Sequence, residues 1–325
     1  MELIQQLSQE LKLRPAQVEA AVRLLDEGNT IPFIARYRKE MTDSLDDAAL
    51  RDLSDRLEYL RNLQKRREEV IRSITEQEKL TPELETAIQA AATLAEVEDL
   101  YRPYKPKRRT RGSIAREKGL EPLAAAIRVQ NTLREPLSMA AEYVNPEKGV
   151  ETAEDALSGA MDIIAEDISD DGEIRKALRL LIHRAAVVTA TGDSTENTTY
   201  KMYYDFKEPV GRIAPHRVLA LNRGEKEGFL KTAIVLEEEK ALETIRRKTV
   251  TANNACGRAV AEAGADSWKR LIAPSMENET FRELFENASE QAIRVFAENL
   301  HHLLMQPPLT GQVVLGWDPG YRSIS

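Results

Sequence analysis

Cysteine and histidine are scarce in this chain of 325 residues, which contains one cysteine, Cys256, and four histidines. A single cysteine excludes an internal disulfide, and the sequence has no paired C-x-x-C spacing that would hold a zinc ion. His301 and His302 are adjacent, but they lack the further ligands that a metal site requires. We therefore expect a protein of the reducing cytoplasm that binds no metal and no cofactor.

Aromatic residues make up only 5% of the chain, whereas Leu, Ala and Glu are abundant. Strands are enriched in β-branched and aromatic side chains, so this composition predicts a mainly α-helical fold. No stretch is long and apolar enough to form a membrane span or the core of a signal peptide. We therefore expect a soluble protein with no membrane partner.

The motifs of common catalytic sites are also missing. The sequence contains neither a G-x-S-x-G nucleophile elbow nor a phosphate-binding G-x-x-x-x-G-K-[ST] loop. Asp318, in "VLGWDPGYRS", follows an apolar strand at the position where an RNase-H-like nuclease holds a divalent metal. Asp-Pro-Gly is also an ordinary turn sequence, and no partner acids are identifiable. We expect this chain not to be an enzyme.

What the sequence does contain is a succession of helix signals. Residues 15–28 are expected to form one helix, because it begins at a proline and ends at a glycine. Pro32 opens a second, shorter helix. Its expected apolar residues are Phe33, Ile34 and Tyr37, which leaves Arg36, Arg38 and Lys39 more exposed. The two helices would form a helix-turn-helix-like pair.

Longer helices are expected after this pair. Apolar residues recur at steps of three and four from Leu50 to Ile74, which predicts one long amphipathic helix capped by Ser44. Threonines at capping positions predict further helix starts. They are Thr81, Thr93 and Thr152. A helix around residues 174–182 is expected to be closed by Gly192, a short strand to cover residues 230–235 and a long helix to cover about 276–304.

These signals predict three regions. Residues 1–192 would form a helical N-terminal domain with the helix-turn-helix-like element. Residues 193–306 would form a helical continuation with the short strand and the long C-terminal helix. Residues 307–325 hold a proline-rich linker and a single apolar strand, which has no partner strand and would begin a further domain.

One stretch of this acidic chain is strongly basic. Residues 101–118, "YRPYKPKRRTRGSIAREK", contain eight Lys or Arg and one acid, Glu117. The chain carries a formal charge of −8, so everything outside this stretch sums to −15. Two prolines and Gly112 indicate a loop. Tyr101 and Tyr104 are interleaved with the cations.

The basic stretch has two interpretations. Its arginines could cover the carboxylates of neighbouring helices, as in many charged loops. Alternatively, its cations could meet phosphates while its tyrosines stack on bases, without reading sequence. The second interpretation predicts that this chain has a site that binds RNA or DNA. Its candidate residues are Arg36, Arg38, Lys39, Tyr101, Tyr104, Lys105, Lys107, Arg108, Arg109 and Arg111.

Five segments, in this order along the chain, resemble signature segments of the bacterial Tex proteins, which are transcription accessory proteins. They read "LLDEGNTIPFIARYRKEMTDSLDDAALRDL", "EDLYRPYKPKRRTRGSIAREKGLEPLA", "HRVLALNRGEKEGFL", "NLHHLLMQPPL" and "VLGWDPGYRS". The resemblance implies a helical N-terminal region with a helix-turn-helix-like element, then a YqgF-type RNase-H-like domain, helix-hairpin-helix repeats and an RNA-binding OB-fold. This chain would hold the first region and the opening strand of the second. Its end departs from the family pattern at Trp317 and at "RSIS".

Three hypotheses follow. The first, which the resemblance also implies, is a non-catalytic transcription accessory protein that binds nucleic acid through backbone electrostatics. The second is a protein-interaction scaffold whose long helices dock on the transcription or translation machinery. The third is a metal-dependent nuclease that uses Asp318.

Overall fold

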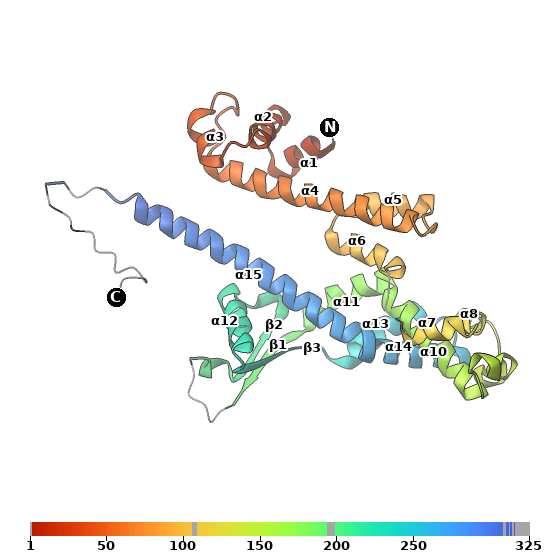
Figure 1. Ribbon diagram of the computed structural model, residues 1–325. Coiled ribbons are helices and arrows are strands. Elements are labelled where there is room, and N and C mark those ends of the chain that lie inside the picture. Colours follow the sequence, from red (N-terminus) through yellow and green to blue (C-terminus); the bar gives the residue numbers. More distant parts are fainter. Residues whose placement is uncertain are drawn as a thin grey trace, which may run out of the picture. The chain divides into compact units, whose positions relative to one another are not determined.

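The computed structural model describes residues 2–105, 109–193 and 199–307, together with residues 310, 311, 313 and 315. The chain divides into two compact units, one formed by residues 1–176 with 249–263 and the other by residues 177–248 with 264–325. Helices dominate both units, and the second contains a three-stranded sheet (Figure 1). The predicted mainly α-helical fold is confirmed. None of the helices in the described part of the chain combines the length and the apolar character needed to cross a membrane.

The first unit begins with three short helices on the first half of a long one. They are α1 (Glu2–Leu11), α2 (Pro15–Asp26), α3 (Ile31–Tyr37) and the long α4 (Asp47–Thr75). As predicted, α2 starts at a proline, and Gly28 beyond its end has a φ of +83°. The N-cap of α4 is Asp46, whose carboxylate accepts from the Ala49 amide at 2.8 Å, so the cap predicted at Ser44 is wrong.

Apolar side chains from these four helices share one core. It includes Leu7, Val18, Ile34, Leu50 and Leu53, all fully buried. The two helices expected at residues 15–28 and after Pro32 both form, as α2 and α3. That the pair forms a helix-turn-helix-like element stays a prediction.

The second half of α4 has a core of its own with α5 (Pro82–Ala90) and α6 (Leu94–Tyr101). Its buried residues are Leu63, Val70, Ile74, Ile88, Ala91, Val97 and Tyr101. The predicted caps are confirmed, because the Thr81 and Thr93 hydroxyls each accept a backbone N–H at 3.2 Å.

The rest of the first unit is built around α10 (Ala153–Asp170). The helices that pack on it are α7 (Arg111–Glu117), α8 (Glu121–Val129) and α9 (Pro136–Ala140). Thr152 and Asp155 form the predicted cap of α10 reciprocally, with backbone-to-side-chain bonds of 3.0 and 3.1 Å. Two helices belong partly to this unit and partly to the other, α11 (Gly172–Ala185) and α14 (Ala255–Ser267).

The second unit contains the sheet, in the order β2-β1-β3 and antiparallel throughout. Its strands are β1 (Val187–Gly192), β2 (Asp205–Pro209) and β3 (Leu230–Val235). Val188 at the centre lies opposite Glu208 on β2 and Ile234 on β3. The strand predicted at residues 230–235 is confirmed. The helix predicted around residues 174–182 is confirmed as α11, but its predicted end at Gly192 is wrong, because the helix ends at Ala185 and the β-branched run after it pairs as β1.

The helices α12 (Pro215–Lys226) and α15 (Ala273–Leu304) pack on each other and against β3 (Figure 1). The remaining helix, α13 (Glu238–Thr249), follows β3 in the chain. Short 3-10 turns occur at η1 (Arg102–Tyr104), η2 (Ala141–Tyr143), η3 (Pro146–Lys148), η4 (Lys201–Tyr203) and η5 (Val210–Arg212), and a π-helical turn, η6 (Trp268–Ile272), leads into α15. The predicted long helix is therefore confirmed as α15. Asp318 lies outside the described residues, as does most of the strand expected before it.

Candidate nucleic-acid interface

Three of the candidate cations lie at the end of α3. Arg36, Arg38 and Lys39 are all exposed, as predicted. Within the described part of the chain, none of the three forms an ion pair with a carboxylate. Glu40, the next residue, is exposed as well, so this short segment keeps a net positive charge. Unpaired cations on an exposed turn are available to phosphate groups.

The aromatic residues of α3 are more exposed than the sequence suggested. Ile34 is fully buried, but Phe33 is 36% and Tyr37 is 67% exposed. Their ring centroids are 5.3 Å apart, and the Arg38 guanidinium lies 5.3 Å from the centre of the Phe33 ring. The expectation that both aromatics form the inner face of α3 is wrong.

The inner face of α3 consists instead of Ile31, Ile34 and Ala35, which pack against the core. These positions follow the i, i+3, i+4 spacing of a helical stripe. Phe33 and Tyr37 are separated by four residues and therefore share the opposite face. Including Ile31 in the stripe would have identified them from the sequence.

The two tyrosines of the basic stretch are anchors. Tyr101, only 8% exposed, belongs to the core of α4, α5 and α6, and its hydroxyl lies 2.9 Å from the Ser73 hydroxyl. Tyr104 is half-buried against the same core, and its carbonyl accepts from the Gln77 side chain at 2.9 Å. Burial argues against base stacking by Tyr101.

The stretch is also less of a loop than predicted. Residues 102–104 form η1, and Gly112 lies in the first turn of α7 rather than in a loop. A Cβ on Gly112 would lie 2.5 Å from the Glu166 carboxyl group, so a larger residue at this position would displace the Glu166 side chain. Thr110 and Ser113 cap α7 reciprocally at 3.0 and 2.8 Å. Within the described part of the stretch, Tyr101 and Tyr104 are therefore held by contacts to α4 and its core, and Thr110 and Ser113 by the cap of α7.

The exposed cations of the stretch follow Tyr104 in the sequence. Lys105, Arg109 and Arg111 are exposed, and Arg109 pairs with Glu117 at 3.3 Å on the surface. Such an exposed pair is weak and readily exchanged for another anion. Lys107 and Arg108 lie outside the described residues.

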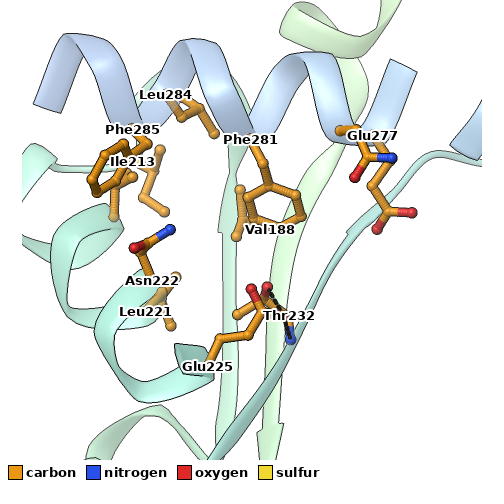
Figure 2. A pocket seen from close by; sticks show the side chains of 12 residues that line it. Val188, Ile213, Leu221, Asn222, Glu225, Thr232, Glu277, Phe281, Leu284 and Phe285 are labelled. Atoms are coloured by element: carbon orange, nitrogen blue, oxygen red, sulfur yellow. Dashed lines mark hydrogen bonds between the residues drawn. The ribbon is translucent and has the colours of Figure 1, made fainter. Parts of the chain in front are cut away.

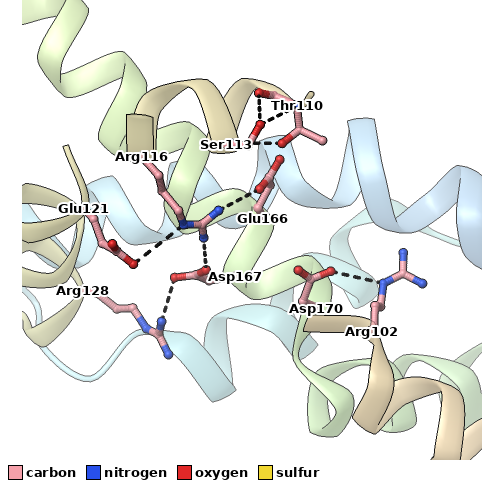
Figure 3. Close-up of polar contacts among 9 residues, drawn as sticks. All are labelled: Arg102, Thr110, Ser113, Arg116, Glu121, Arg128, Glu166, Asp167 and Asp170. Carbon is pink, nitrogen blue, oxygen red and sulfur yellow. Dashed lines mark hydrogen bonds and ion pairs between the residues drawn. The ribbon is translucent and has the colours of Figure 1, made fainter. Parts of the chain in front are cut away.

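Other arginines of the stretch cover carboxylates, as the alternative interpretation predicted (Figure 3). Arg116 lies between Glu166 at 3.1 Å and Asp167 at 2.6 Å, and Arg102 pairs with Asp170 at 3.4 Å. Arg128 of α8 adds a second guanidinium to Asp167 at 2.9 Å. Burial raises the pKa of the Asp167 carboxyl group, while both guanidiniums oppose that shift. In the basic stretch, Arg102 and Arg116 therefore bind carboxylates of α10, whereas Lys105, Arg109 and Arg111 are exposed.

A pocket of about 270 Å³ lies between α12, α15 and β3 (Figure 2). Its lining includes the apolar Val188, Phe281 and Phe285. Glu225 accepts from the Thr232 amide and hydroxyl at 3.1 and 2.7 Å, and Glu277 accepts from the Ile234 amide at 2.9 Å. These carboxylates thereby satisfy backbone donors of β3. An acidic and apolar lining is unsuited to a polyanion.

No group of three or more metal-ligating side chains occurs among residues 2–105, 109–193 and 199–307 or the four described positions beyond them. Cys256 is buried, and burial raises the pKa of its thiol. The nuclease hypothesis depends on Asp318, outside the described residues, and stays a prediction.

Comparison with known proteins identifies the family. Residues 1–75 match the Tex-like protein N-terminal domain, and residues 131–296 match the Tex central region-like family. The chain belongs to the Tex family. Among its relatives, Protein tex of Bordetella pertussis is 43% identical over 99% of this chain and 43% of its own length.

Two further relatives of this chain carry informative names. The transcriptional accessory protein Tex of Neisseria gonorrhoeae is 38% identical over 99% of this chain and 44% of its own length. The human S1 RNA-binding domain-containing protein 1 is 29% identical over 99% of this chain and 34% of its own length. This chain thus spans less than half the length of these relatives.

Proposed function

We propose that this chain is a nucleic-acid-binding part of a transcription accessory protein, and that it acts in the cytoplasm without catalysis. The observation that carries the proposal is a set of exposed cations on an otherwise acidic chain. They are Arg36, Arg38, Lys39, Lys105, Arg109 and Arg111. Lys107 and Arg108 extend the set by their sequence positions.

The relatives support this proposal by name. One is called a transcriptional accessory protein, and another is named for an S1 RNA-binding domain. This chain spans less than half the length of each relative, so the functions that these names describe are proposed for this chain. Transcription complexes contain both nucleic acid and protein, so the proposal includes the transcription machinery as a second partner.

The proposed contacts are with the sugar-phosphate backbone. Lys and Arg on turns and helix ends meet phosphates as point charges or forks, and such contacts position a nucleic acid without reading its sequence. The proposal therefore covers RNA and DNA of any sequence. It also requires affinity to fall steeply with salt, because each neutralised phosphate releases counterions.

A salt series with matched variants tests the proposal. One variant changes Lys105, Arg109 and Arg111 to Gln. The control changes Lys240, Arg246 and Arg247 of α13, three cations that pair with glutamates close in sequence. Both variants lose the same charge, so any difference between them reports on location.

Fluorescence anisotropy with duplex DNA and with single-stranded RNA supplies the measurement. We expect wild-type affinity to fall linearly on a log-log salt plot, and the first variant to reduce the slope by about 2 to 3 on duplex DNA. The control variant should keep the wild-type slope. Binding that ignores salt, or equal losses in both variants, would contradict the proposal.

A second candidate function, a docking scaffold for the transcription machinery, is favoured by the far half of α15. There, large apolar side chains are exposed on the helix: Ile293, Val295, Phe296, Leu300, Leu303 and Leu304. Exposed apolar patches of this kind often mark protein interfaces. Protein partners that stay bound after nuclease treatment, but are lost with Ile293→Ser and Phe296→Ser, would favour the scaffold; partners lost with the nucleic acid would count against it.

A further inference from the structure

The outer face of α3 presents two aromatic rings that lie outside the core of the first four helices. The helix has only seven residues, and its inner stripe of Ile31, Ile34 and Ala35 already supplies its contacts to the core. Phe33 and Tyr37 are not among the side chains packed against that core. Large exposed aromatics lose hydrophobic stabilisation that burial would give, so a role at the surface is the better explanation for their position.

The rings are arranged as a platform. Their centroids lie 5.3 Å apart with an interplanar angle of 43°, and Tyr37 is the more exposed ring at 67%. Arg38 lies over the Phe33 ring, which orients its guanidinium beside the platform. A planar ligand that stacks on Tyr37 would therefore lie next to a fixed cation.

The charge around the platform favours an anionic ligand. Arg36 lies between the two aromatic residues in sequence and Arg38 and Lys39 follow them, and within the described residues no carboxylate pairs with these three cations. Of the acids that follow, Asp43 is paired with Arg14, and Glu40 is exposed. An aromatic face bordered by cations fits a ligand that combines planar rings with negative charge.

Single-stranded nucleic acid has this combination. Its bases offer free π-faces to protein aromatics, and its phosphates meet neighbouring cations. In a duplex the same faces are stacked on each other and are inaccessible except at the ends. We infer that α3 carries a base-stacking site for single-stranded nucleic acid, formed by Phe33 and Tyr37, with Arg36, Arg38 and Lys39 as its phosphate contacts.

This inference rests on the proposed function and adds a preference to it. The cations alone bind duplexes and single strands, whereas the rings recognise unpaired bases only. Removing a ring should therefore weaken single-strand binding selectively. Removing cations should weaken the binding of both polymers and reduce the salt slope.

The test compares Tyr37→Ala with two control variants of the 325-residue chain. Tyr37→Phe keeps the ring and removes only the hydroxyl. Phe296→Ala removes a ring on α15 that is also 67% exposed but lies in the other compact unit. Because Tyr37 lies outside the core, all three variants should unfold at nearly the wild-type temperature, which a thermal melt checks.

The probes are a single-stranded oligonucleotide and its duplex, at one salt concentration. We expect Tyr37→Ala to weaken single-strand binding about 5- to 100-fold and duplex binding less than about 2-fold. Tyr37→Phe and Phe296→Ala should match the wild type. A single-stranded probe with 2-aminopurine should show stacking directly, as quenching that Tyr37→Ala reduces.

Distinct outcomes separate this inference from the proposed function. If Tyr37→Ala binds both probes like the wild type while the Lys105, Arg109 and Arg111 variant loses salt-dependent binding, the stacking site is overturned and the proposed function stands. If Tyr37→Phe loses as much as Tyr37→Ala, or both probes weaken equally, stacking is again overturned. If only the aromatic variant loses binding, stacking stands and the electrostatic proposal fails. If Tyr37→Ala binds both nucleic-acid probes like the wild type but no longer binds a protein that the wild type binds, the face docks a protein and the inference is overturned.

Discussion

At the scale of single residues, one buried amide joins distant parts of the first unit. Gln130 is 3% exposed and ends α8 in the left-handed conformation, at a φ of +57°. Its side chain donates to the Thr249 carbonyl at 2.8 Å and accepts from the Thr251 amide at 2.9 Å. Asn254 completes the connection by donating to the Gln130 carbonyl at 2.8 Å. A glutamine side chain is suited to this position because it is both donor and acceptor.

Replacing this amide should be costly. Gln130→Leu has a similar size but cannot make the bonds, and it leaves the backbone N–H of Thr251 without its acceptor. We expect a loss of about 2 to 4 kcal/mol in the free energy of unfolding, measured by urea denaturation. Gln89→Leu, which removes an exposed amide on α5, should stay within about 0.5 kcal/mol of the wild type. Equal effects of the two substitutions would show that the buried Gln130 amide contributes no more to the free energy of unfolding than an exposed amide does.

The same scale explains which site residues were predictable. Exposure of Arg36, Arg38 and Lys39 follows from helical spacing within a few residues, and the structure places them as expected. Burial of Tyr101 depends on Ser73, 28 positions earlier on another helix, so no local pattern reports it. The sequence pattern therefore predicted the exposed cations of the basic stretch correctly, but not the burial of Tyr101.

At the scale of elements, two ion pairs connect α4 to the helices before it. Arg56 contacts Glu10 of α1 at 2.5 and 3.0 Å, and Arg61 contacts Asp26 of α2 at 2.7 and 2.8 Å. Hydrogen bonds from these guanidiniums lower the pKa of both carboxyl groups. Bidentate pairs of this kind fix the direction in which short helices lie on a long one.

The sign of the pKa shifts sets the pH dependence. A carboxyl group with a lowered pKa in the folded state contributes stability above its unfolded pKa of about 4, and the contribution is lost as pH falls through the folded value. Because all four side chains are a third to a half exposed, each pair should be worth only about 0.2 to 1 kcal/mol. Arg56→Gln and Arg61→Gln should therefore unfold at lower urea than the wild type at pH 7, and the difference should shrink near pH 3.

Arg51→Gln is the matched control, because Arg51 pairs with Asp47 inside α4 and connects no second helix. It should leave the docking of α1 and α2 intact, as hydrogen exchange in those helices would report. A deficit in the two test variants that is as large at pH 3 as at pH 7 would mean that packing, rather than the ion pairs, explains their effect.

Elements were predictable where their signals are local. Caps at Thr81, Thr93 and Thr152 depend on three neighbouring residues, and each is present. The strands β1 and β2 were missed because a strand is defined by pairing, and the partner of Val188 on β3 lies 46 positions later. The one strand of this sheet that was predicted, residues 230–235, occupies one edge of the sheet.

At the scale of the whole molecule, the chain leaves the first compact unit and returns to it. Residues 249–263 come after most of the second unit in sequence, yet they belong with residues 1–176. Cys256, Val260 and Ala263 of this segment are buried, and its backbone is held by Gln130. The sequence predicted a domain boundary at residue 192, which would separate this segment from the unit that it completes.

That boundary can be tested with a fragment of residues 1–192. Without residues 249–263 the fragment exposes apolar surface and leaves the Gln130 amide without its partners. We expect its helices α8 and α10 to exchange amide hydrogens faster than in the full chain, and the fragment to melt on the order of 10 °C lower. A synthetic peptide of residues 249–263 in excess should restore protection by binding the folded form.

A peptide with Asn254→Ala serves as the control, because it lacks the bonds from the Asn254 side chain to the carbonyls of Gln130 and Thr132. It should restore less protection than the natural peptide at the same concentration. If the fragment of residues 1–192 is as protected and as stable as the full chain, the first unit is complete without the returning segment. In that case the boundary at residue 192 divides the chain correctly, and the contacts of Gln130 to residues 249–254 add little to stability.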